Sequence, residues 1–334
     1  MTGEGKMRKR KIVTLRDIAA KTGYTVNTVS HALTGKTDIS PQTVEYIKNV
    51  AEEMGYINDS IASSMRTGRT GTIAVILADI TNPLFAIIVH TVEQLANSVG
   101  YSVFILNTNE SREFELKAIK TALGKKVDGI IICPCPDCAD NLDFLRKTGC
   151  PYVLVGRKCP GHRSVTPDDV KCGRLAAEFL AGLGCRRIAF VNGQLTLSCS
   201  VERLIGYREG LREAGINYDD ELVIESKTQT GAAGTVLDKL AQTDYDGIFA
   251  FSDLIAYELI NGCGSDGKTI RADVPMISVD HISEKLPYLK QINTIGPSGK
   301  SMADIAFEII MSLIDELPLD FPVETVIDVK TYPA

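Results

Sequence analysis

The feature that most constrains the fold is a regular alternation of short apolar runs and amphipathic stretches after Thr72. The runs are rich in Val, Ile and Leu, which is typical of parallel strands buried on both faces. The stretches between them are long enough to be the helices that connect such strands. Strands are expected over residues 72–78, 101–107, 128–134, 151–156, 187–192, 222–226, 246–251, 275–280 and 292–296. The pattern predicts an α/β fold with doubly wound parallel sheets.

The expected strands fall into two similar sets, divided near residues 158–164, so residues 71–334 are predicted to form a two-lobed core. We expect the first lobe at about 71–161 plus 293–320, and the second at about 162–292 plus 321–334. In doubly wound sheets a ligand binds outside the carboxyl ends of the strands. A small molecule is therefore expected in the crevice between the lobes.

Residues 12–57 have a different pattern, that of three short helices. Thr14 is a good N-cap with Asp17 three residues later, Gly23 ends the first helix, and Thr25 caps the second. Ser40 and a following proline begin the third helix. This spacing is typical of a helix-turn-helix, and it predicts an all-α head that places its second helix in the major groove of DNA.

Three side chains lie at the start of the second helix, on the side opposite its apolar face. Asn27 can pair with an adenine edge, His31 can donate to a guanine or a phosphate, and Val26 can contact a thymine methyl group. An ordinary solvated helix face would carry similar residues, so this assignment depends on the linker and core that come after the head. Residues 58–70 are Ser-rich and weakly apolar, and we interpret them as a linker that becomes helical only when bound.

The charge is distributed unevenly between the head and the core. Residues 1–70 carry 11 Lys and Arg against 7 Asp and Glu, whereas the remainder carries 25 against 35. A basic head on an acidic body is what a phosphate-binding module attached to a regulatory domain would show. Chance variation would give a similar imbalance, so charge alone does not decide the function.

The nine cysteines indicate a reducing compartment with free thiols rather than a disulfide framework. Three of them, Cys133, Cys135 and Cys138, lie close together, but their spacing matches no standard zinc site. We expect no metal and no cofactor, and the sequence leaves open whether this group has a redox role. No apolar stretch is long enough to cross a bilayer and no signal peptide is recognisable, so a cytoplasmic, nucleoid-associated protein without membrane contact is expected.

Polar side chains at the ends of the expected core strands indicate where the small molecule binds. Phe85 follows the first strand, Arg203 is expected to open the helix after the fifth, and three further residues end later strands: Ser252, Asp253 and Asp280. An aromatic surface with an arginine and carboxylates suits a hydroxyl-rich ligand such as a sugar, because it combines donors with acceptors. Each residue singly is as easily a cap or a loop ion pair.

Two other classes of protein fit the sequence less well. An enzyme is not expected, because the sequence holds no Gly-rich phosphate loop, no Gly-x-Ser-x-Gly turn and no His-Glu-x-x-His motif. A solute-binding protein for transport would share a two-lobed core. It would, however, be exported and would lack a helix-turn-helix head.

The ordered motifs of the chain resemble those of the lactose-repressor/galactose-repressor (LacI/GalR) family. The motifs are Thr-Leu-Arg-Asp-Ile-Ala at 14–19, Thr-Val-Ser-His-Ala-Leu at 28–33, Ile-Ser-Pro-Gln-Thr at 39–43, Met-Gly-Tyr at 54–56, Ala-Asp-Ile-Thr-Asn-Pro-Leu-Phe at 78–85, Asp-Asp at 168–169, Arg203 with Gly-Tyr at 206–207, Ser-Asp at 252–253 and Ser-Val-Asp at 278–280. The resemblance covers the chain from about Val13 to its C-terminus. It implies a transcription regulator, in most members a repressor, with a core like that of the periplasmic binding proteins.

The resemblance also implies roles for individual residues in DNA binding. Val26, Asn27 and His31 match base-reading positions, and backbone-contacting positions are matched by Thr14, Thr25, Thr34 and Ser40. Residues 59–66 match a hinge helix that binds the minor groove, with Ser63 and Met65 among its contacts. Met65 stands at the position of the apolar side chain that is wedged between base pairs.

In the core, the resemblance implies that an effector contacts Phe85, Arg203, Ser252, Asp253 and Asp280. Leu197 and Cys199 stand where relatives commonly have polar contacts, which indicates a ligand with a less polar edge. The family further implies a homodimer that binds pseudo-palindromic operator DNA, with the effector shifting the balance between two states of the lobes. No heptad tail that would make a tetramer is recognisable, so a dimer is expected.

Overall fold

The computed structural model describes residues 13–34, 36, 38–56, 68–228, 231, 233–262, 270–271, 273–287 and 289–334. The chain divides into two compact units, residues 1–68 and 69–334, which we describe separately. No helix in the described ranges is long and apolar enough to span a membrane.

The head is a cluster of three helices, as expected: α1 (Leu15–Thr22), α2 (Val26–Leu33) and α3 (Pro41–Glu53). Thr14 and Asp17 form a complete capping box at the start of α1, and Gly23 ends that helix at a φ of 78°, a conformation that favours glycine. The core of the head includes Ile18, Val29 and Ile47, one from each helix, all with no exposed surface. Their burial holds α2 at a fixed angle against the other two helices.

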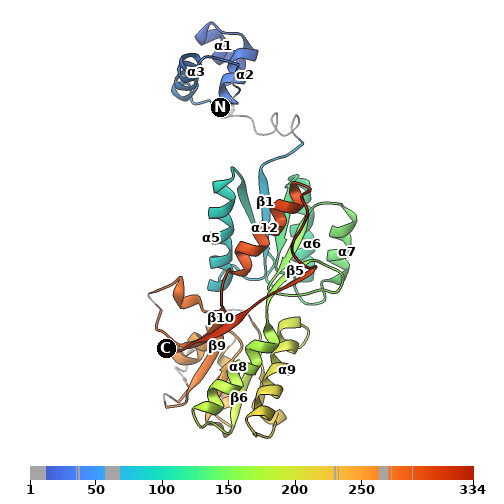
Figure 1. Ribbon diagram of the computed structural model, residues 1–334, viewed down its shortest axis with the longest axis vertical. Helices are drawn as coiled ribbons and strands as arrows, with labels where there is room; N and C mark the ends of the chain where they lie inside the picture. Colours follow the sequence, from blue (N-terminus) through green and yellow to red (C-terminus); the bar gives the residue numbers. More distant parts are fainter. Residues whose placement is uncertain are drawn as a thin grey trace, which may run out of the picture. The chain divides into compact units, whose positions relative to one another are not determined.

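The larger unit contains two six-stranded sheets (Figure 1). The first has the order β11-β5-β4-β3-β1-β2, and all its pairs are parallel. Its strands are β1 (Thr72–Leu77), β2 (Ser102–Asn107), β3 (Gly129–Ile132), β4 (Tyr152–Val155), β5 (Ser164–Pro167) and β11 (Glu324–Ile327). One face packs against α5 (Pro83–Ser98) and α12 (Met302–Ile314), and the other against α6 (Arg112–Gly124) and α7 (Ala139–Lys147).

The second sheet has the order β12-β10-β9-β8-β6-β7 and is parallel except for the β10–β12 pair. Its strands are β6 (Ile188–Asn192), β7 (Val223–Glu225), β8 (Gly247–Ala250), β9 (Met276–Val279), β10 (Asn293–Pro297) and β12 (Val329–Tyr332). Helices α8 (Asp169–Gly182) and α9 (Ser198–Glu213) cover one face, and α10 (Ala233–Leu240) and α11 (Asp253–Asn261) cover the other. Two short 3-10 helices, η1 (Asp220–Leu222) and η2 (Ile282–Glu284), complete this lobe. The predicted doubly wound, two-lobed architecture is confirmed.

The points at which the chain crosses between the lobes differ from those expected from the sequence. The expected crossings lay near residues 161, 293 and 320, whereas the sheets place them after Pro167, after Pro297 and between Ile327 and Val329. Each lies further along the chain because β5 pairs with β4, and β10 pairs with β9, before the chain leaves the lobe. The three crossings bring the carboxyl ends of both sheets together.

Helices α8 and α9 approach each other unusually closely in the second lobe. A Cβ atom built on Gly206 of α9 would lie 1.8 Å from the carbonyl oxygen of Val170, and one on Gly173 of α8 would lie 2.0 Å from that of Arg203. The missing side chains therefore allow the two backbones to touch. This contact sets the positions of Asp169 and Arg203, which belong to the candidate site.

Candidate functional site

The three predicted DNA-reading residues are on the outer surface of α2. Val26 is 41% exposed, Asn27 is exposed, and His31 is partly exposed one turn further along. The buried residues Val29 and Ala32 lie on the opposite side of the helix. The first turn and a half of α2 thus presents one apolar, one amide and one imidazole side chain to solvent, the types that contact base edges.

The four predicted backbone-contacting residues all lie at helix ends. Thr14, Thr25 and Ser40 are the N-caps of α1, α2 and α3, and each accepts a hydrogen bond from a backbone N–H three residues later. Thr34 is the C-cap of α2 and donates its hydroxyl to the carbonyl of Ser30. Their capping contacts stabilise the helices, and a phosphate contact through these groups stays a prediction. Ser63 and Met65 of the expected hinge lie outside the described residues.

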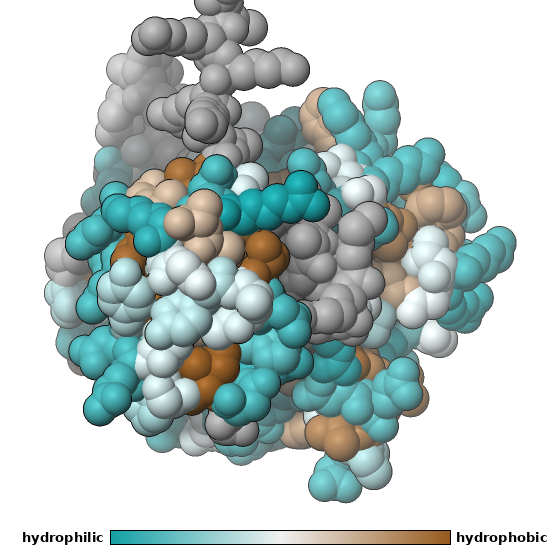
Figure 2. Space-filling view, turned by 90° about the horizontal axis from the view of Figure 1, so that it is seen from above, coloured by the Kyte–Doolittle hydropathy of each residue, from teal (hydrophilic) through white to brown (hydrophobic). Residues whose placement is uncertain are grey.

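The head also holds residues that the sequence did not single out. The Asp38 carboxylate lies 2.7 Å from Nδ1 of His31, and Lys36 lies 3.4 Å from Nε2. Tyr24 and Tyr46 are exposed and their rings make an edge contact with centroids 6.5 Å apart. Neither pair follows from helical spacing, because each joins residues from different elements. Figure 2 shows one face, on which apolar residues form small separate patches among hydrophilic ones.

Arg203 is at the centre of the polar cluster in the second lobe. It lies in the second turn of α9, which begins at Ser198, so it does not open the helix as expected. Its Nε donates to Asp169 at 2.8 Å, its guanidinium also donates to the carbonyl of Phe251, and it stacks over the Phe251 ring at 4.4 Å from the centroid. Both members of the ion pair are buried, with Arg203 only 5% exposed.

Two of the predicted effector residues are fully engaged within the protein. Ser252 is the N-cap of α11, and its hydroxyl accepts from the N–H of Ile255. The Asp253 carboxylate accepts from the hydroxyls of Ser278 (2.5 Å) and Thr294 (2.6 Å) and from a backbone N–H. These bonds fasten α11 to β9 and β10. A ligand contact through Ser252 or Asp253 stays a prediction.

Asp280 directly follows β9 and lines a cavity of about 90 Å³ between the two lobes. Its backbone φ of 123° is in a region that side chains rarely adopt, a form of strain that is concentrated at functional sites. Burial and the nearby Asp253 charge raise its pKa well above the ordinary value, while the Arg203 charge opposes them. The cavity is otherwise mostly apolar, with lining residues that include Leu84, Ile282 and Met302.

Phe85 is not among the residues that line this cavity. It lies in the first turns of α5, is 8% exposed, and packs in the apolar core of the first lobe. Its neighbour Leu84 is the residue that reaches the cavity. The sequence placed the right loop at the cleft, but helix rotation decides which of two adjacent side chains faces it.

The first lobe contributes a buried ion pair that the sequence did not indicate. Arg157, after β4, donates two hydrogen bonds to Glu110, after β2, at 2.6 and 2.7 Å, and a third to the carbonyl of Pro134. The two side chains are 8% and 11% exposed. Glu110 also accepts from Thr228 of the second lobe at 3.3 Å. The loops after β2 and β4, two strands that are not adjacent in the sheet, thus meet at its carboxyl edge, although 47 residues separate the partners.

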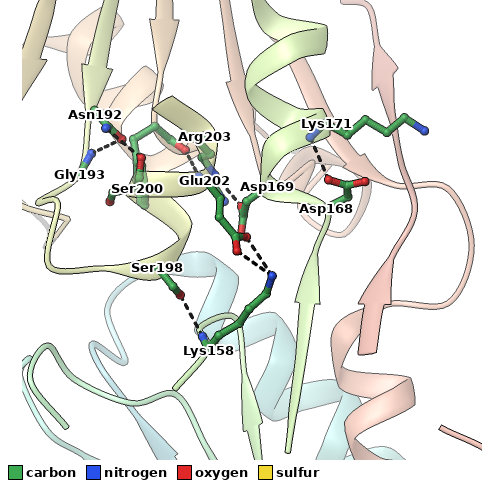
Figure 3. Close-up of polar contacts among 11 residues, drawn as sticks. Lys158, Asp168, Asp169, Lys171, Asn192, Gly193, Ser198, Ser200, Glu202 and Arg203 are labelled. Carbon is green, nitrogen blue, oxygen red and sulfur yellow. Dashed lines mark hydrogen bonds and ion pairs between the residues drawn. The ribbon is translucent and has the colours of Figure 1, made fainter. Parts of the chain in front are cut away.

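Lys158 makes the clearest contacts between the lobes (Figure 3). Its backbone N–H donates to the hydroxyl of Ser198 at 2.9 Å, and its ammonium pairs with Glu202 at 2.7 Å. In the same view Arg203, which directly follows Glu202 in α9, contacts Asp169 of α8. The start of α9 therefore contacts both lobes. A change in the angle between the lobes must break or strain the contacts of Lys158.

The cysteine group at the carboxyl end of β3 is buried. Burial raises the pKa of Cys133 and of Cys138 to about 12, and it also raises that of Cys135. All three are free thiols. In the described part of the chain no three His, Cys, Asp or Glu side chains are arranged to hold a metal ion.

Two family models match the chain. The model of bacterial regulatory proteins of the lacI family matches residues 14–59, and the model of periplasmic binding proteins and the sugar-binding domain of the LacI family matches residues 70–278. The chain is a member of the LacI family. It is a DNA-binding transcription regulator, and the expected resemblance and function class are confirmed.

Curated relatives and solved structures agree with this assignment. The transcriptional repressor PurR of Vibrio atlanticus is 26% identical over 91% of this chain and 93% of its own, and the regulator DegA of Bacillus subtilis is 30% identical over 80% and 81%. A solved complex of the transcriptional regulator CelR with cellobiose has a TM-score of 0.65 at 26% identity, covering 96% of this chain and 98% of that one. The Lac repressor bound to ONPG has a TM-score of 0.80 at 20% identity, covering 96% and 98%, and supports the fold. These proteins are regulators, which confirms that this LacI-family chain is not an enzyme.

Proposed function

We propose that this LacI-family regulator represses transcription by binding a pseudo-palindromic operator as a homodimer in the cytoplasm. The observation that carries the proposal is the outward face of α2, where Val26, Asn27 and His31 are exposed on a helix that a buried core holds in place. A dimer places two such helices in successive major grooves, so the operator should mirror its twofold symmetry. Solved structures of relatives include a Lac repressor dimer bound to operator, which supports this arrangement.

The proposal can be tested by selecting bound sequences from a pool of random duplexes with the full chain. We expect an enriched palindrome in which Asn27→Ala or His31→Ala abolishes the preference at one position of each half-site, because each change removes a base contact. The hinge variant Met65→Ala should bind the same sequence more weakly, because the apolar wedge is shortened. Recovery of no sequence by folded protein at low salt, with or without a metabolite extract, would contradict the proposal.

We further propose that the ligand binds between the lobes at Arg203 and Asp280 and is a neutral, hydroxyl-rich metabolite such as a sugar. Three cations near the cleft already have acidic partners: Arg157 is paired with Glu110, Arg203 with Asp169, and Lys158 with Glu202. An anionic ligand would have to break one of these pairs or use Lys285, an exposed residue that also lines the cavity, whereas hydroxyl groups can donate to Asp280. The apolar lining of the cavity and the apolar Leu197 and Cys199 suit a ligand with one less polar edge.

A thermal-shift screen of the full chain with neutral sugars and their phosphorylated forms tests this second part. A neutral ligand should raise the melting temperature, and Asp280→Asn should weaken its binding by about tenfold or more, the effect of losing a hydrogen bond to a charged group. The surface variant Glu178→Gln is a matched control in the same lobe. Stabilisation by the phosphorylated compounds alone would contradict a neutral ligand.

A further inference from the structure

The imidazole of His31 has an acidic neighbour at one nitrogen and a basic neighbour at the other. Its Nδ1 lies 2.7 Å from Oδ2 of Asp38, and its Nε2 lies 3.4 Å from Nζ of Lys36. The His31 side chain is 23% exposed, whereas that of Asp38 is 57% exposed. Both neighbours lie in the segment between α2 and α3, so they approach the reading helix from outside it.

The chemistry of these neighbours selects one tautomer of the ring. A carboxylate can only accept a hydrogen bond, so Nδ1 must carry the proton that points at Asp38. An ammonium group can only donate, so Nε2 must present its lone pair to Lys36. The hydrogen bond from His31 lowers the pKa of Asp38, which keeps this carboxylate ionised and able to accept. The two contacts are therefore compatible with the same neutral form of His31.

A carboxylate beside a DNA-reading helix has an electrostatic cost. Phosphate groups dominate the affinity of proteins for DNA, and a negative side chain near them is repelled. Asp38 is exposed, stands five residues beyond the end of α2 and contacts His31 on the face of that helix that bears Val26 and Asn27. Its bond to His31 gives a reason for an acidic group at this place.

We infer that Asp38 is a positioning residue that fixes the tautomer of His31 and thereby sets the class of base that His31 reads. The inference rests on the proposed function, since it requires α2 to enter the major groove. There Nε2 acts as an acceptor, and the donors that the groove offers are the amino groups of adenine N6 and cytosine N4. Guanine presents only acceptors, N7 and O6, so His31 selects an amino-bearing base in place of the guanine expected from the sequence.

Lys36 completes the arrangement in the absence of DNA. Its ammonium lies where the amino group of the base would donate, so it satisfies Nε2 until DNA binds. In the complex the base takes this place, and the released ammonium becomes available to pair with a phosphate. The exchange leaves the bond between Asp38 and Nδ1 unchanged.

The inference can be tested by selection from random duplexes with the full chain, provided that the base contacted by His31 is identified as well as the affinity. The base pair that His31 contacts is the one whose enrichment disappears in His31→Ala. Every Watson–Crick pair contains one amino-bearing base, so the contacted group is identified with base analogues at that pair. Removing the amino group, with purine in place of adenine or 2-pyrimidinone in place of cytosine, should weaken wild-type binding by about fivefold or more, the lower range for one good base contact, whereas 7-deazaguanine should not weaken it. The dependence on the amino group should be smaller in Asp38→Ala, because a free imidazole can carry its proton on either nitrogen.

Two further variants separate positioning from a general effect on the head. Asp38→Asn keeps an oxygen that accepts from Nδ1 but adds an amide N–H that can donate to it, so its dependence on the amino group should lie between those of the wild type and Asp38→Ala. Glu52→Ala removes a comparable exposed carboxylate from α3 and should leave both this dependence and the fold unchanged. A wild type that depends on guanine N7 and not on the amino group at this pair, or an unchanged dependence in Asp38→Ala, would overturn the inference while leaving the proposed function intact. A failure of all proteins to enrich any sequence would overturn both.

Nitrogen-15 NMR of the full chain labelled at histidine tests the tautomer without DNA. The His31 signals are identified by their loss in His31→Ala. We expect a protonated Nδ1 and an unprotonated Nε2 in the wild type, and a mixture of tautomers in Asp38→Ala. A proton on Nε2 in neutral wild-type His31 would overturn the inference whatever the selection shows.

Discussion

At the scale of single residues, the candidate site consists of charges that the protein neutralises itself. Arg203 was recognisable from the sequence because it follows a strand and matches a family motif. Its partner Asp169, and the Arg157–Glu110 pair, depend on which loops the sheets bring together. Such contacts are set by tertiary packing, so no local sequence pattern predicts them.

The pair formed by Arg203 and Asp169 should be important for stability. Asp169→Ala leaves a buried guanidinium without its carboxylate, and the loss should be about 3–5 kcal/mol in the free energy of unfolding. Urea titration of the full chain measures it. Glu178→Ala, which breaks the half-exposed pair with Arg174, should cost less than about 1 kcal/mol. Equal losses in the two variants would contradict the role assigned to burial.

Stability should also depend on pH through Asp253. Burial raises its pKa to about 6, against 3.8 for the ordinary carboxyl group. Between about pH 4 and 6 the folded protein binds a proton that the unfolded chain has released, so this group makes the protein less stable as the pH rises. In Asp253→Asn the fall should be smaller over this range, as measured by urea titration at several pH values. If the free energies of unfolding of the two proteins change in parallel with pH, Asp253 is ionised in both the folded and the unfolded state.

At the scale of elements, periodicity predicted the three head helices and nine of the strands to within about two residues. It missed β5, β11 and β12, which are four residues long and lie at or next to the sheet edges. β5 ends in a proline and β11 alternates exposed with buried residues, so neither has the continuous apolar run of a central strand. The missing β5 and β11 account for the boundaries expected near residues 161 and 320, whereas the boundary near 293 was misplaced because β10, although predicted, pairs with β9 of the second lobe.

The close contact of α8 and α9 gives a prediction at this scale. In Gly206→Ala the new methyl group meets the carbonyl of Val170, so the helices must separate, with a loss of about 3 kcal/mol in stability and weaker ligand binding. Gly182→Ala is the matched control on α8, because a methyl group there meets no atom within 4 Å. It should be neutral or slightly stabilising. Thermal unfolding of both variants decides whether the backbone contact is required for stability. Equal melting temperatures for Gly206→Ala and Gly182→Ala would show that it is not.

At the scale of the whole molecule, the contacts between the lobes determine how a ligand can act. Lys158 joins the first lobe to α9 through Ser198 and Glu202, and Thr228 joins Glu110 from the other side. These bonds form only at one angle between the lobes. A ligand changes the balance between angles by binding one of them more tightly.

Loss of the Lys158–Glu202 pair should therefore shift the core toward open arrangements. Glu202→Gln removes the charge but keeps the size, and spin labels on α7 and α9 should report a population at longer distances. Added ligand should restore the closed distance in part. The control Glu178→Gln lies within one lobe and should give the wild-type distribution. An unchanged distribution in Glu202→Gln would mean that other contacts hold the lobes closed.

Control of the DNA site by the ligand site is the central property proposed for this molecule. Its most direct test is the dissociation constant of the full chain for a selected operator duplex, measured at fixed salt with and without saturating ligand. We predict a change of about 5–150-fold, the range typical of coupled sites, and a reciprocal change of the same factor in ligand affinity when operator is present. Asp280→Asn should remove the effect at ligand concentrations that saturate the wild type. Identical dissociation constants with and without bound ligand would contradict this coupling.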